Sequence, residues 1–264
     1  RTRDPWPVLV AEVMLQQTQA SRIAERFDPF LHRYPSPAVL SATPVARVLA
    51  DWSGLGYNRR AVLLHRTATA IAADGWPTSV AGLEALPGIG AYSARAIAAI
   101  AFGQPVGAVD TNVRRWLVRR FGVGAADRRG LQLLADRLAE QASADDPLEP
   151  GTWTHATMEF GARICLARTP RCDICPVSRG CPSRTDPQRV PVPRQSPATA
   201  STRAARGALL RALADAPGHR ISQATAGRSV VNLTPADYEA LSAGLERDGL
   251  VHRSGKVLIL GPRA

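Results

Sequence analysis

The sequence predicts an all-α main domain followed by a small C-terminal module of helices and a β-hairpin. Between residues 4 and 170, apolar residues recur at three- and four-residue spacing, and no run alternates as a strand would. A Pro- and Ser-rich stretch without periodicity follows at 187–201, as expected of a linker. Beyond it, two amphipathic segments precede two short apolar runs that flank a turn at Ser254 and Gly255.

The helices expected in the main domain are short, which favours an orthogonal bundle over a long coiled coil. Their ranges are 5–19, 20–34, 37–42, 44–52, 58–73, 79–85, 91–102, 111–121, 127–141 and 151–166. After the linker, we expect helices at 202–215 and 234–248 and strands at 250–252 and 257–260. Helices that end in a hairpin are typical of winged-helix modules, which often place a helix in the major groove of DNA. A helical cap that only packs on the main domain is an equal alternative. The predicted division is therefore a main domain at 1–186, a linker at 187–201 and a module at 202–264.

Charge is the most informative feature of the composition. The 264 residues include 33 Lys and Arg against 22 Asp and Glu, so the net charge is +11, which favours a polyanionic partner such as nucleic acid. Lys256 is the single lysine. The longest apolar stretch, 96–102, ends at Gly103 and is too short to cross a bilayer. No secretory leader is recognisable, and we expect a cytoplasmic protein.

All the cysteines lie in one short segment, as Cys165-x6-Cys172-x2-Cys175-x5-Cys181. Two disulfides, a zinc site and an iron–sulfur cluster are the possible readings. Disulfides are disfavoured because a large helical domain in the cytosol does not need them. Zinc sites usually show two C-x2-C knuckles, and only one pair here has that spacing. Four thiolates in one compact loop suit a cubane cluster better, although zinc stays open.

Three further features are ambiguous when each is taken alone. The turn Leu86-Pro87-Gly88-Ile89-Gly90 can present backbone N–H groups to a phosphate, or it can simply connect two helices. Asp110 stands before a helix, where it is most often an N-cap. Glu12 lies in an apolar helical stretch, so it is either a partly buried acid with a raised pKa or a solvent-facing residue.

In this order, and with the cysteine segment behind them, these features resemble the helix-hairpin-helix DNA glycosylases that carry a 4Fe4S cluster. This superfamily includes endonuclease III and the MutY-type adenine glycosylases. The similarity covers residues 4 to about 185 and rests on AEVMLQQTQ (11–19), GLGYNRRA (54–61), LPGIGAYSA (86–94), AVDTNVRR (108–115) and the cysteine spacing. It implies a two-lobed orthogonal helical core with a helix-hairpin-helix and an iron–sulfur loop.

Two positions favour the MutY-type branch. Glu12 is similar to the MutY acid, whereas the endonuclease III branch is apolar there. Tyr92 stands where a glycosylase that also cleaves the strand has Lys, and because Lys256 belongs to the C-terminal module, the resemblance implies a monofunctional glycosylase. Thymine- and uracil-mismatch glycosylases of the same superfamily also place Tyr at that position, so they remain an alternative. An iron–sulfur DNA-binding regulator is a more remote one.

The resemblance also implies roles for individual residues and a substrate. The substrate would be double-stranded DNA with a mismatched or damaged base pair, from which a monomeric enzyme at the nucleoid excises adenine opposite 8-oxoguanine or G. The module after the linker differs from the Nudix-like domain with which MutY proteins recognise 8-oxoguanine. The implied residues are Glu12, Asp110 and Tyr92 for catalysis; Gln16, Gln17, Thr18, Tyr57, Leu86, Gly88 and Gly90 for DNA binding; and Cys165, Cys172, Cys175 and Cys181 for the 4Fe4S cluster.

Overall fold

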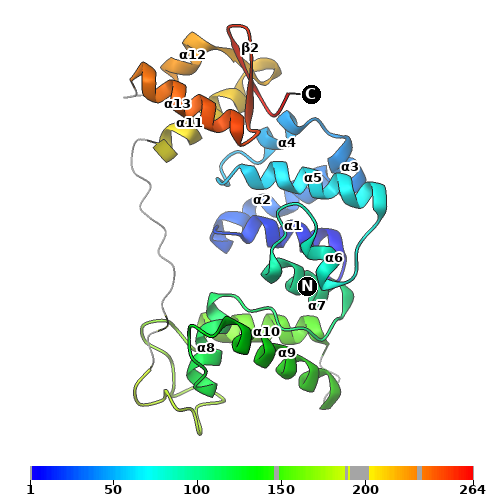
Figure 1. The fold of residues 1–264 in the computed structure, drawn as a ribbon, viewed down its shortest axis with the longest axis vertical. Coiled ribbons are helices and arrows are strands. Elements are labelled where there is room, and N and C mark those ends of the chain that lie inside the picture. Colours follow the sequence, from blue (N-terminus) through cyan, green and yellow to red (C-terminus); the bar gives the residue numbers. More distant parts are fainter. Residues whose placement is uncertain (1, 146–148, 188–189, 191–201, 231–233, 264) are drawn as a thin grey trace. The chain divides into compact units, whose positions relative to one another are not determined.

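A computed structural model describes residues 2–145, 149–187, 190, 202–230 and 234–263 of the chain (Figure 1). Almost all of the linker predicted at 187–201 lies outside these residues. The contacts divide the chain into two compact units. The first comprises Arg1–Glu12, Pro77–Ala85 and Ile89–Arg194, and the second comprises Val13–Trp76, Leu86–Gly88 and Gln195–Ala264.

The regular secondary structure among the described residues of the first unit is entirely helical. The boundary between the units falls within α1 (Pro5–Leu15), after Glu12. The other helices of this unit are α6 (Val80–Glu84), α7 (Ala91–Phe102), α8 (Thr111–Phe121), α9 (Arg128–Asp145) and α10 (Pro150–Arg163). Helix α10 packs against α7, α8 and α9, and these helices are drawn in green in Figure 1.

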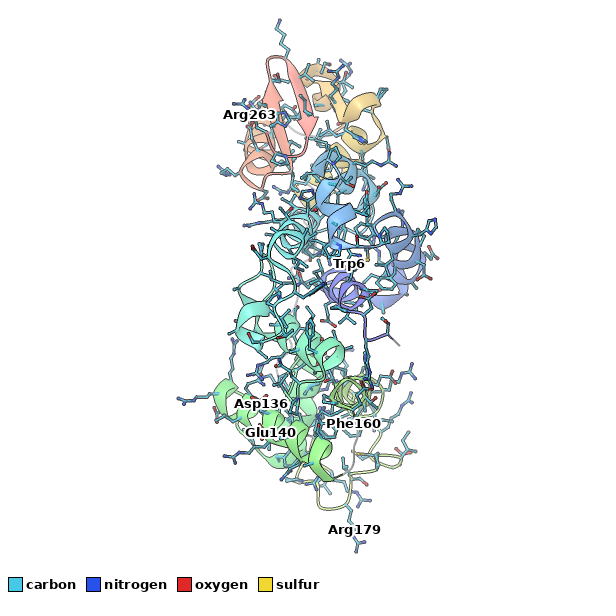
Figure 2. All side chains as sticks on the ribbon, turned by 90° about the vertical axis from the view of Figure 1, so that its right-hand side faces the viewer. Trp6, Asp136, Glu140, Phe160, Arg179 and Arg263 are labelled. Carbon is cyan, nitrogen blue, oxygen red and sulfur yellow. The ribbon has the colours of Figure 1, made fainter. Side chains whose placement is uncertain are left out.

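A core cluster holds α8, α9 and α10 together. Trp116 and Leu117 of α8 are buried with Leu131 of α9, and Phe160 of α10 meets the Trp116 ring edge-on at a centroid distance of 5.7 Å. Figure 2 labels Phe160 on α10 and Asp136 on α9. The chain leaves α7 at Gly103 and α8 at Gly122, both in the left-handed conformation, which explains why each helix ends where the sequence predicts.

The second unit combines the rest of the main domain with the C-terminal module. Its first helices are α2 (Ala20–Arg33), α3 (Pro37–Ala42), α4 (Val45–Asp51) and α5 (Arg59–Asp74). The module consists of α11 (Thr202–Asp215), η1 (Pro217–His219), β1 (Arg220–Ser222), α12 (Gln223–Arg228), α13 (Pro235–Arg247), β2 (Val251–Ser254) and β3 (Val257–Leu260). The strands form an antiparallel sheet in the order β1-β3-β2.

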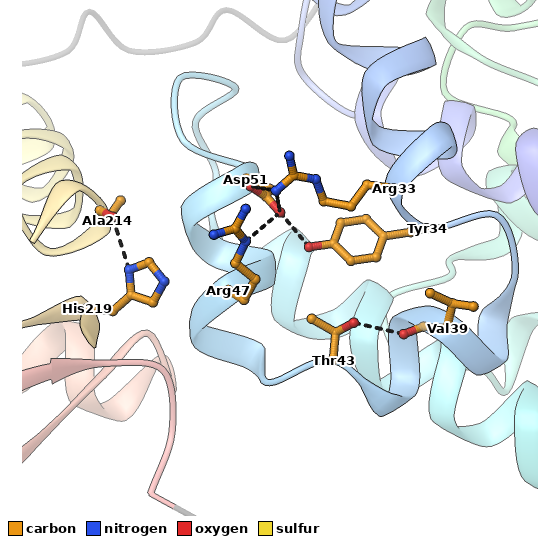
Figure 3. A network of polar contacts seen from close by, with 8 residues as sticks. All are labelled: Arg33, Tyr34, Val39, Thr43, Arg47, Asp51, Ala214 and His219. Carbon is orange, nitrogen blue, oxygen red and sulfur yellow. Dashed lines mark hydrogen bonds and ion pairs between the residues drawn. The ribbon is translucent and has the colours of Figure 1, made fainter. Parts of the chain in front are cut away.

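Polar contacts stabilise α4, on which α11 of the module packs. Asp51 at the end of α4 accepts from Arg33 at 3.0 Å and from the Tyr34 hydroxyl at 2.6 Å, and Arg47 pairs with the same carboxylate at 3.3 Å (Figure 3). Burial is the main reason why the pKa of Tyr34 is raised, and the Asp51 hydrogen bond adds to it. In the module, the His219 ring hydrogen bonds to a backbone carbonyl of α11, as the same figure shows.

The fold class and most helix ranges agree with the sequence-based prediction, with two informative differences. The first helix ends at Leu15 rather than at 19, because the next residues turn away and Gln17 adopts a φ of 55°. The predicted hairpin is part of a sheet that also includes β1, and neither β1 nor α12 is predicted. A strand of three residues is too short to show an alternating pattern. Among the described residues, no helix combines the length and apolar character needed to span a membrane.

The close approach of α10 to the start of α8, near Asp110, depends on a glycine. A Cβ atom added to Gly161 of α10 would lie 2.6 Å from the carbonyl oxygen of Asn112 in the first turn of α8. Both atoms belong to helix backbones, so neither can move away easily.

We therefore expect Gly161→Ala to lower the free energy of unfolding by about 1–3 kcal/mol in urea denaturation. The control is Gly227→Ala in α12, where an added Cβ meets nothing within 4 Å. That variant should be as stable as the wild type or more stable by up to about 1 kcal/mol. Equal stability of the two variants would show that the contact between α10 and α8 is not tight.

Candidate active site

Glu12 is a buried acid in the last turns of α1. Only 8% of its surface is exposed, among apolar neighbours such as Val8 and Val13. Burial raises its pKa from 4.5 to about 7, a hydrogen bond from Tyr92 lowers it in part, and the charge of Asp110 raises it again. A carboxyl group with this pKa is half protonated near neutral pH, as a general acid requires.

Tyr92 stands in the first turn of α7, next to both carboxyl groups. Its pKa is raised by burial, by the charges of Glu12 and Asp110, and by the hydrogen bond to Glu12. The hydroxyl therefore stays protonated and donates a hydrogen bond to Glu12. The same oxygen lies 3.7 Å from the sulfur of Met158 on α10, which limits its movement.

Asp110 caps α8 and keeps a polar environment. Its Oδ1 accepts from the backbone N–H groups of Asn112 at 2.8 Å and Val113 at 2.6 Å, and its Oδ2 accepts from the Asn112 side chain at 2.9 Å. Three donors and the positive end of a helix stabilise the charged carboxylate. The N-cap role expected from the sequence is thus confirmed, close to Glu12 and Tyr92.

Helix α8 also holds the backbone of the cysteine loop (residues 165–181). Arg115 and Arg119 are buried to 4% and 3% exposure, and burial lowers the pKa of Arg115. Arg115 donates to the Cys165 carbonyl at 2.7 Å and to the Asn112 side chain at 3.0 Å. Arg119 donates to the Leu166 carbonyl at 2.6 Å. Helix α8 therefore positions Asp110 at its N-terminus, and its buried arginines hold the start of the cysteine loop.

The four cysteine side chains line one cavity, together with Trp116, Arg119 and Phe160. All are free thiols, so the disulfide reading is wrong for the described structure. Burial raises the pKa of Cys175, and the charges of the other thiols raise it further. Within the described residues, no three His, Cys, Asp or Glu side chains are arranged as a metal site. A cavity lined by four soft sulfur donors nevertheless fits a thiolate-bound metal group.

In the second unit, one buried guanidinium holds two loops, residues 16–18 and 54–57. Arg60 of α5 is 7% exposed, and its side chain also lies 5.4 Å from the ring centres of Trp52 and Tyr57. Its side-chain nitrogens donate to the carbonyl oxygens of Val13 (2.9 Å), Met14 (2.7 Å), Gln16 (2.6 Å), Gly56 (3.1 Å), Leu55 (3.4 Å) and Tyr57 (3.4 Å) and to the Thr18 hydroxyl (2.9 Å).

These loops carry strained residues at two of the predicted DNA-binding positions. Gln17 has a φ of 55° and Tyr57 a φ of 48°, a conformation that is uncommon without glycine. Both side chains are exposed, Tyr57 to 40%. Arg60 lies within the motif GLGYNRRA (54–61), which by itself predicts no role for this residue. Its position one turn before Leu64, on the buried face of α5, is the signal that could have revealed it.

The glycine turn after α6 presents its backbone to solvent. Gly88 is exposed with a φ of 78°, and a Cβ atom there would lie 2.8 Å from Leu63. The Thr67 hydroxyl donates to the Pro87 carbonyl at 2.6 Å, and the Gln16 side chain reaches the Gly88 carbonyl at 3.4 Å. Leu86 is half-buried, and Gly90, also exposed, directly precedes α7.

The predicted site residues thus form two groups. In the first unit, Glu12, Tyr92 and Asp110 lie together. In the second unit, the loops at 16–18 and 54–57 lie beside the turn at 86–88, through the contact of Gln16 with Gly88. The first group has the chemistry of a paired acid and carboxylate. The second exposes backbone groups together with the side chains of Gln17 and Tyr57, whose backbones are strained.

The chain is similar to several known proteins. Residues 10–140 match the HhH-GPD superfamily of base excision DNA repair proteins. The adenine DNA glycosylase of Mycolicibacterium smegmatis is 43% identical over 198 residues, which cover 70% of this chain and 65% of that protein. The adenine DNA glycosylase of Mycobacterium tuberculosis is 39% identical over 218 residues, which cover 79% of this chain and 70% of that protein.

The chain is also similar to solved structures. A thermostable thymine-DNA glycosylase superimposes with a TM-score of 0.62 at 28% identity, covering 70% of this chain and 86% of that one. A non-covalent endonuclease III–DNA complex gives a TM-score of 0.58 at 25% identity, with the same coverage. The chain therefore belongs to the HhH-GPD superfamily of base excision DNA repair proteins and, within it, to the adenine DNA glycosylase family.

Proposed function

We propose that this protein removes mispaired adenine, opposite 8-oxoguanine or G, from double-stranded DNA by hydrolysing the N-glycosidic bond. The single observation that carries the proposal is Glu12, a buried acid whose pKa is raised to about 7 and which lies beside Tyr92 and Asp110. The similarity to curated adenine DNA glycosylases supports it. We infer that the protein acts as a monomer at the nucleoid.

The role of Glu12 follows from the leaving group. Adenine leaves poorly as an anion but well as a neutral base, and protonation at N7 achieves this conversion. Because Glu12 is protonated in about half of the molecules near pH 7, it can donate that proton as the bond breaks. Tyr92 orients the acid through its hydrogen bond. After the base has left, the Glu12 carboxylate can accept a proton from the attacking water.

Asp110 stabilises the sugar. Loss of the base leaves an oxocarbenium-like cation, and a carboxylate that stays charged lowers the energy of this state. Asp110 accepts hydrogen bonds from the backbone N–H groups at the start of α8, which stabilise a negative charge on this carboxylate. The carboxylate can also attack the sugar carbon to form a transient acetal that water hydrolyses, as in retaining glycosidases.

Access to the bond requires that the adenine leave the base stack. The turn at Leu86–Gly90 binds the backbone of the damaged strand through its N–H groups, and the exposed Gln17 and Tyr57 fill the gap in the duplex, with Gln16 and Thr18 beside them. We call residues 16–18 and 54–57 the insertion loops. Their strained backbones favour this reading, because such strain persists mainly where it serves a function.

Strand cleavage is not expected. Cleavage of the sugar–phosphate backbone through a Schiff base needs a neutral amine, and Tyr92 occupies the position at which a bifunctional relative has lysine. The single lysine, Lys256, lies in the turn between β2 and β3 of the C-terminal module.

We propose that Cys165, Cys172, Cys175 and Cys181 hold a 4Fe4S cluster, since they line one cavity. When bound, such a cluster would cross-link the cysteine loop. The loop exposes Arg168, Arg171 and Arg179, and Figure 2 shows Arg179 projecting from it. A fixed basic loop of this kind can bind DNA phosphates.

A second candidate function is the removal of thymine or uracil from mismatches with G. The similarity to a solved thymine-DNA glycosylase favours it. Pyrimidines have no N7, however, so the raised pKa of Glu12 would have no evident use.

The protein should release adenine from duplexes that contain A opposite 8-oxoguanine or G, and strand breaks should appear only after alkali. Glu12→Gln and Asp110→Asn should each lower the single-turnover rate by at least the roughly hundredfold to ten-thousandfold typical of general acid catalysis, while DNA affinity is retained. Release of T or U from mismatches with G, but not of A, would establish the second candidate. Near wild-type rates in either variant would contradict the two-carboxylate mechanism.

The rate should depend on pH through Glu12. Because its acid form is lost as pH rises, excision should fall above about pH 7. Tyr92→Phe removes the hydrogen bond that lowers the pKa of Glu12, so the fall should move to higher pH, whereas Tyr238→Phe on α13 should leave it unchanged. A single-turnover profile that is identical in wild type and Tyr92→Phe would argue against Glu12 as the acid.

Anaerobically purified protein should be yellow-brown and contain about four irons per chain, as metal analysis can determine. Cys172→Ser should lower the iron content, and His32→Ser, which changes an exposed residue of α2, should not. Stoichiometric zinc without iron would overturn the cluster assignment.

A further inference from the structure

The second unit contains a cleft that the proposed chemistry does not use. Its volume is about 810 Å³. One wall comes from the insertion loops and the start of α5, and the other comes from α11 and the end of α13 in the C-terminal module. Its lining includes Gln17, Arg22, Tyr57, Arg59, Arg203 and Asp248.

The cleft is strongly basic. Among the described residues of its lining, Asp248 is the only acidic one, and its carboxylate is paired with Arg206. Arg22, Arg59 and Arg203 are exposed, and none of them forms an ion pair with a carboxylate among the described residues. Three such guanidinium groups around one cleft attract a polyanion, and their planar donor pattern matches phosphate oxygens.

The position of the cleft limits what the polyanion can be. Gln17 and Tyr57, whose side chains would enter the duplex, line the same wall as Arg59. A duplex that receives these side chains must bring its own phosphates to the cleft. A free nucleotide or another small anion would explain the arginines but not their shared wall with the insertion loops.

The module packs on α4 of the same unit. Leu209 and Leu213 of α11 are fully buried, and α11 packs on α4. A Cβ atom at Gly261, just after β3, would lie 3.3 Å from the backbone nitrogen of Ala46 on α4. Arg203 is therefore carried by a helix that packs on α4, the helix that ends just before the loop 54–57, and such an anchored helix can make a phosphate contact of defined register.

We propose that this cleft binds backbone phosphates of the duplex beside the insertion site, so that α11 extends the DNA-binding surface onto the C-terminal module through Arg203, together with Arg22 and Arg59. The inference rests on the proposed function, because it takes the insertion loops to enter DNA. It assigns the module a role in substrate binding that does not depend on reading bases in the major groove.

The test measures the affinity of the full chain for a duplex with A opposite G across a range of salt concentrations. Arg203→Gln removes one charge but keeps a polar side chain, so affinity at low salt should fall roughly threefold to tenfold and the slope of log K against log salt should decrease by about 0.9. Arg220→Gln removes the same charge from an exposed position on β1 that does not line the cleft, and it should leave the slope unchanged.

Duplexes with neutral methylphosphonate linkages identify which DNA strand contacts the cleft. The linkages are placed beside the mispair on the target strand in one set of duplexes and on the opposite strand in another. On the strand that the cleft contacts, the substitution should weaken wild-type binding and abolish the difference between wild type and Arg203→Gln. On the other strand, that difference should persist.

Equal slopes for Arg203→Gln and wild type, or an equal decrease for Arg220→Gln, would overturn the proposal. Failure of the proposed function looks different, because the wild type itself would then release no adenine from any duplex. Arg220→Gln, whose side chain lies outside the cleft, should release adenine at the wild-type single-turnover rate.

Discussion

Buried arginines that donate to backbone carbonyl groups support both units of this structure. A buried guanidinium is costly unless all its donors are satisfied, and a loop leaves carbonyl groups that no helix can satisfy. Arg60 meets both needs for the loops at 16–18 and 54–57. Arg115 and Arg119 do so for the start of the cysteine loop. Loops held in this way are as well positioned as the helices from which the arginines extend.

Burial and hydrogen bonding also explain how two carboxyl groups that lie close together can take different roles. Glu12 is surrounded by apolar side chains, so burial favours its neutral form. Asp110 receives the N–H groups at the start of α8, which favour the charge. Tyr92 hydrogen bonds to the first and lies in the field of both. Pairs of titratable groups whose environments differ in this way are typical of sites that combine acid catalysis with charge stabilisation.

The C-terminal module joins the second unit rather than standing apart in the contact pattern. Its sheet and helices match the winged-helix-like character expected from the sequence, yet its α11 faces the loops that carry Gln17 and Tyr57. Basic side chains, Arg59 and Arg203 among them, line the cleft where these loops and the module meet. In such a site, phosphate contacts set position and affinity, while selectivity for the base comes from the pocket that receives it.

The sequence by itself determined the helical fold class, the limits of most helices, and the residues around which the site is built. Apolar spacing is a local property and predicts helices such as α7 and α8 directly, and motifs identify Glu12, Tyr92 and Asp110 through their resemblance to a family. Only the tertiary structure decided that the first helix stops at Leu15, that Arg60 joins two loops, and that Arg203 faces Tyr57 across a cleft. Each of these depends on hydrogen bonds or packing between residues far apart in the chain, which leave no periodic signal in the sequence.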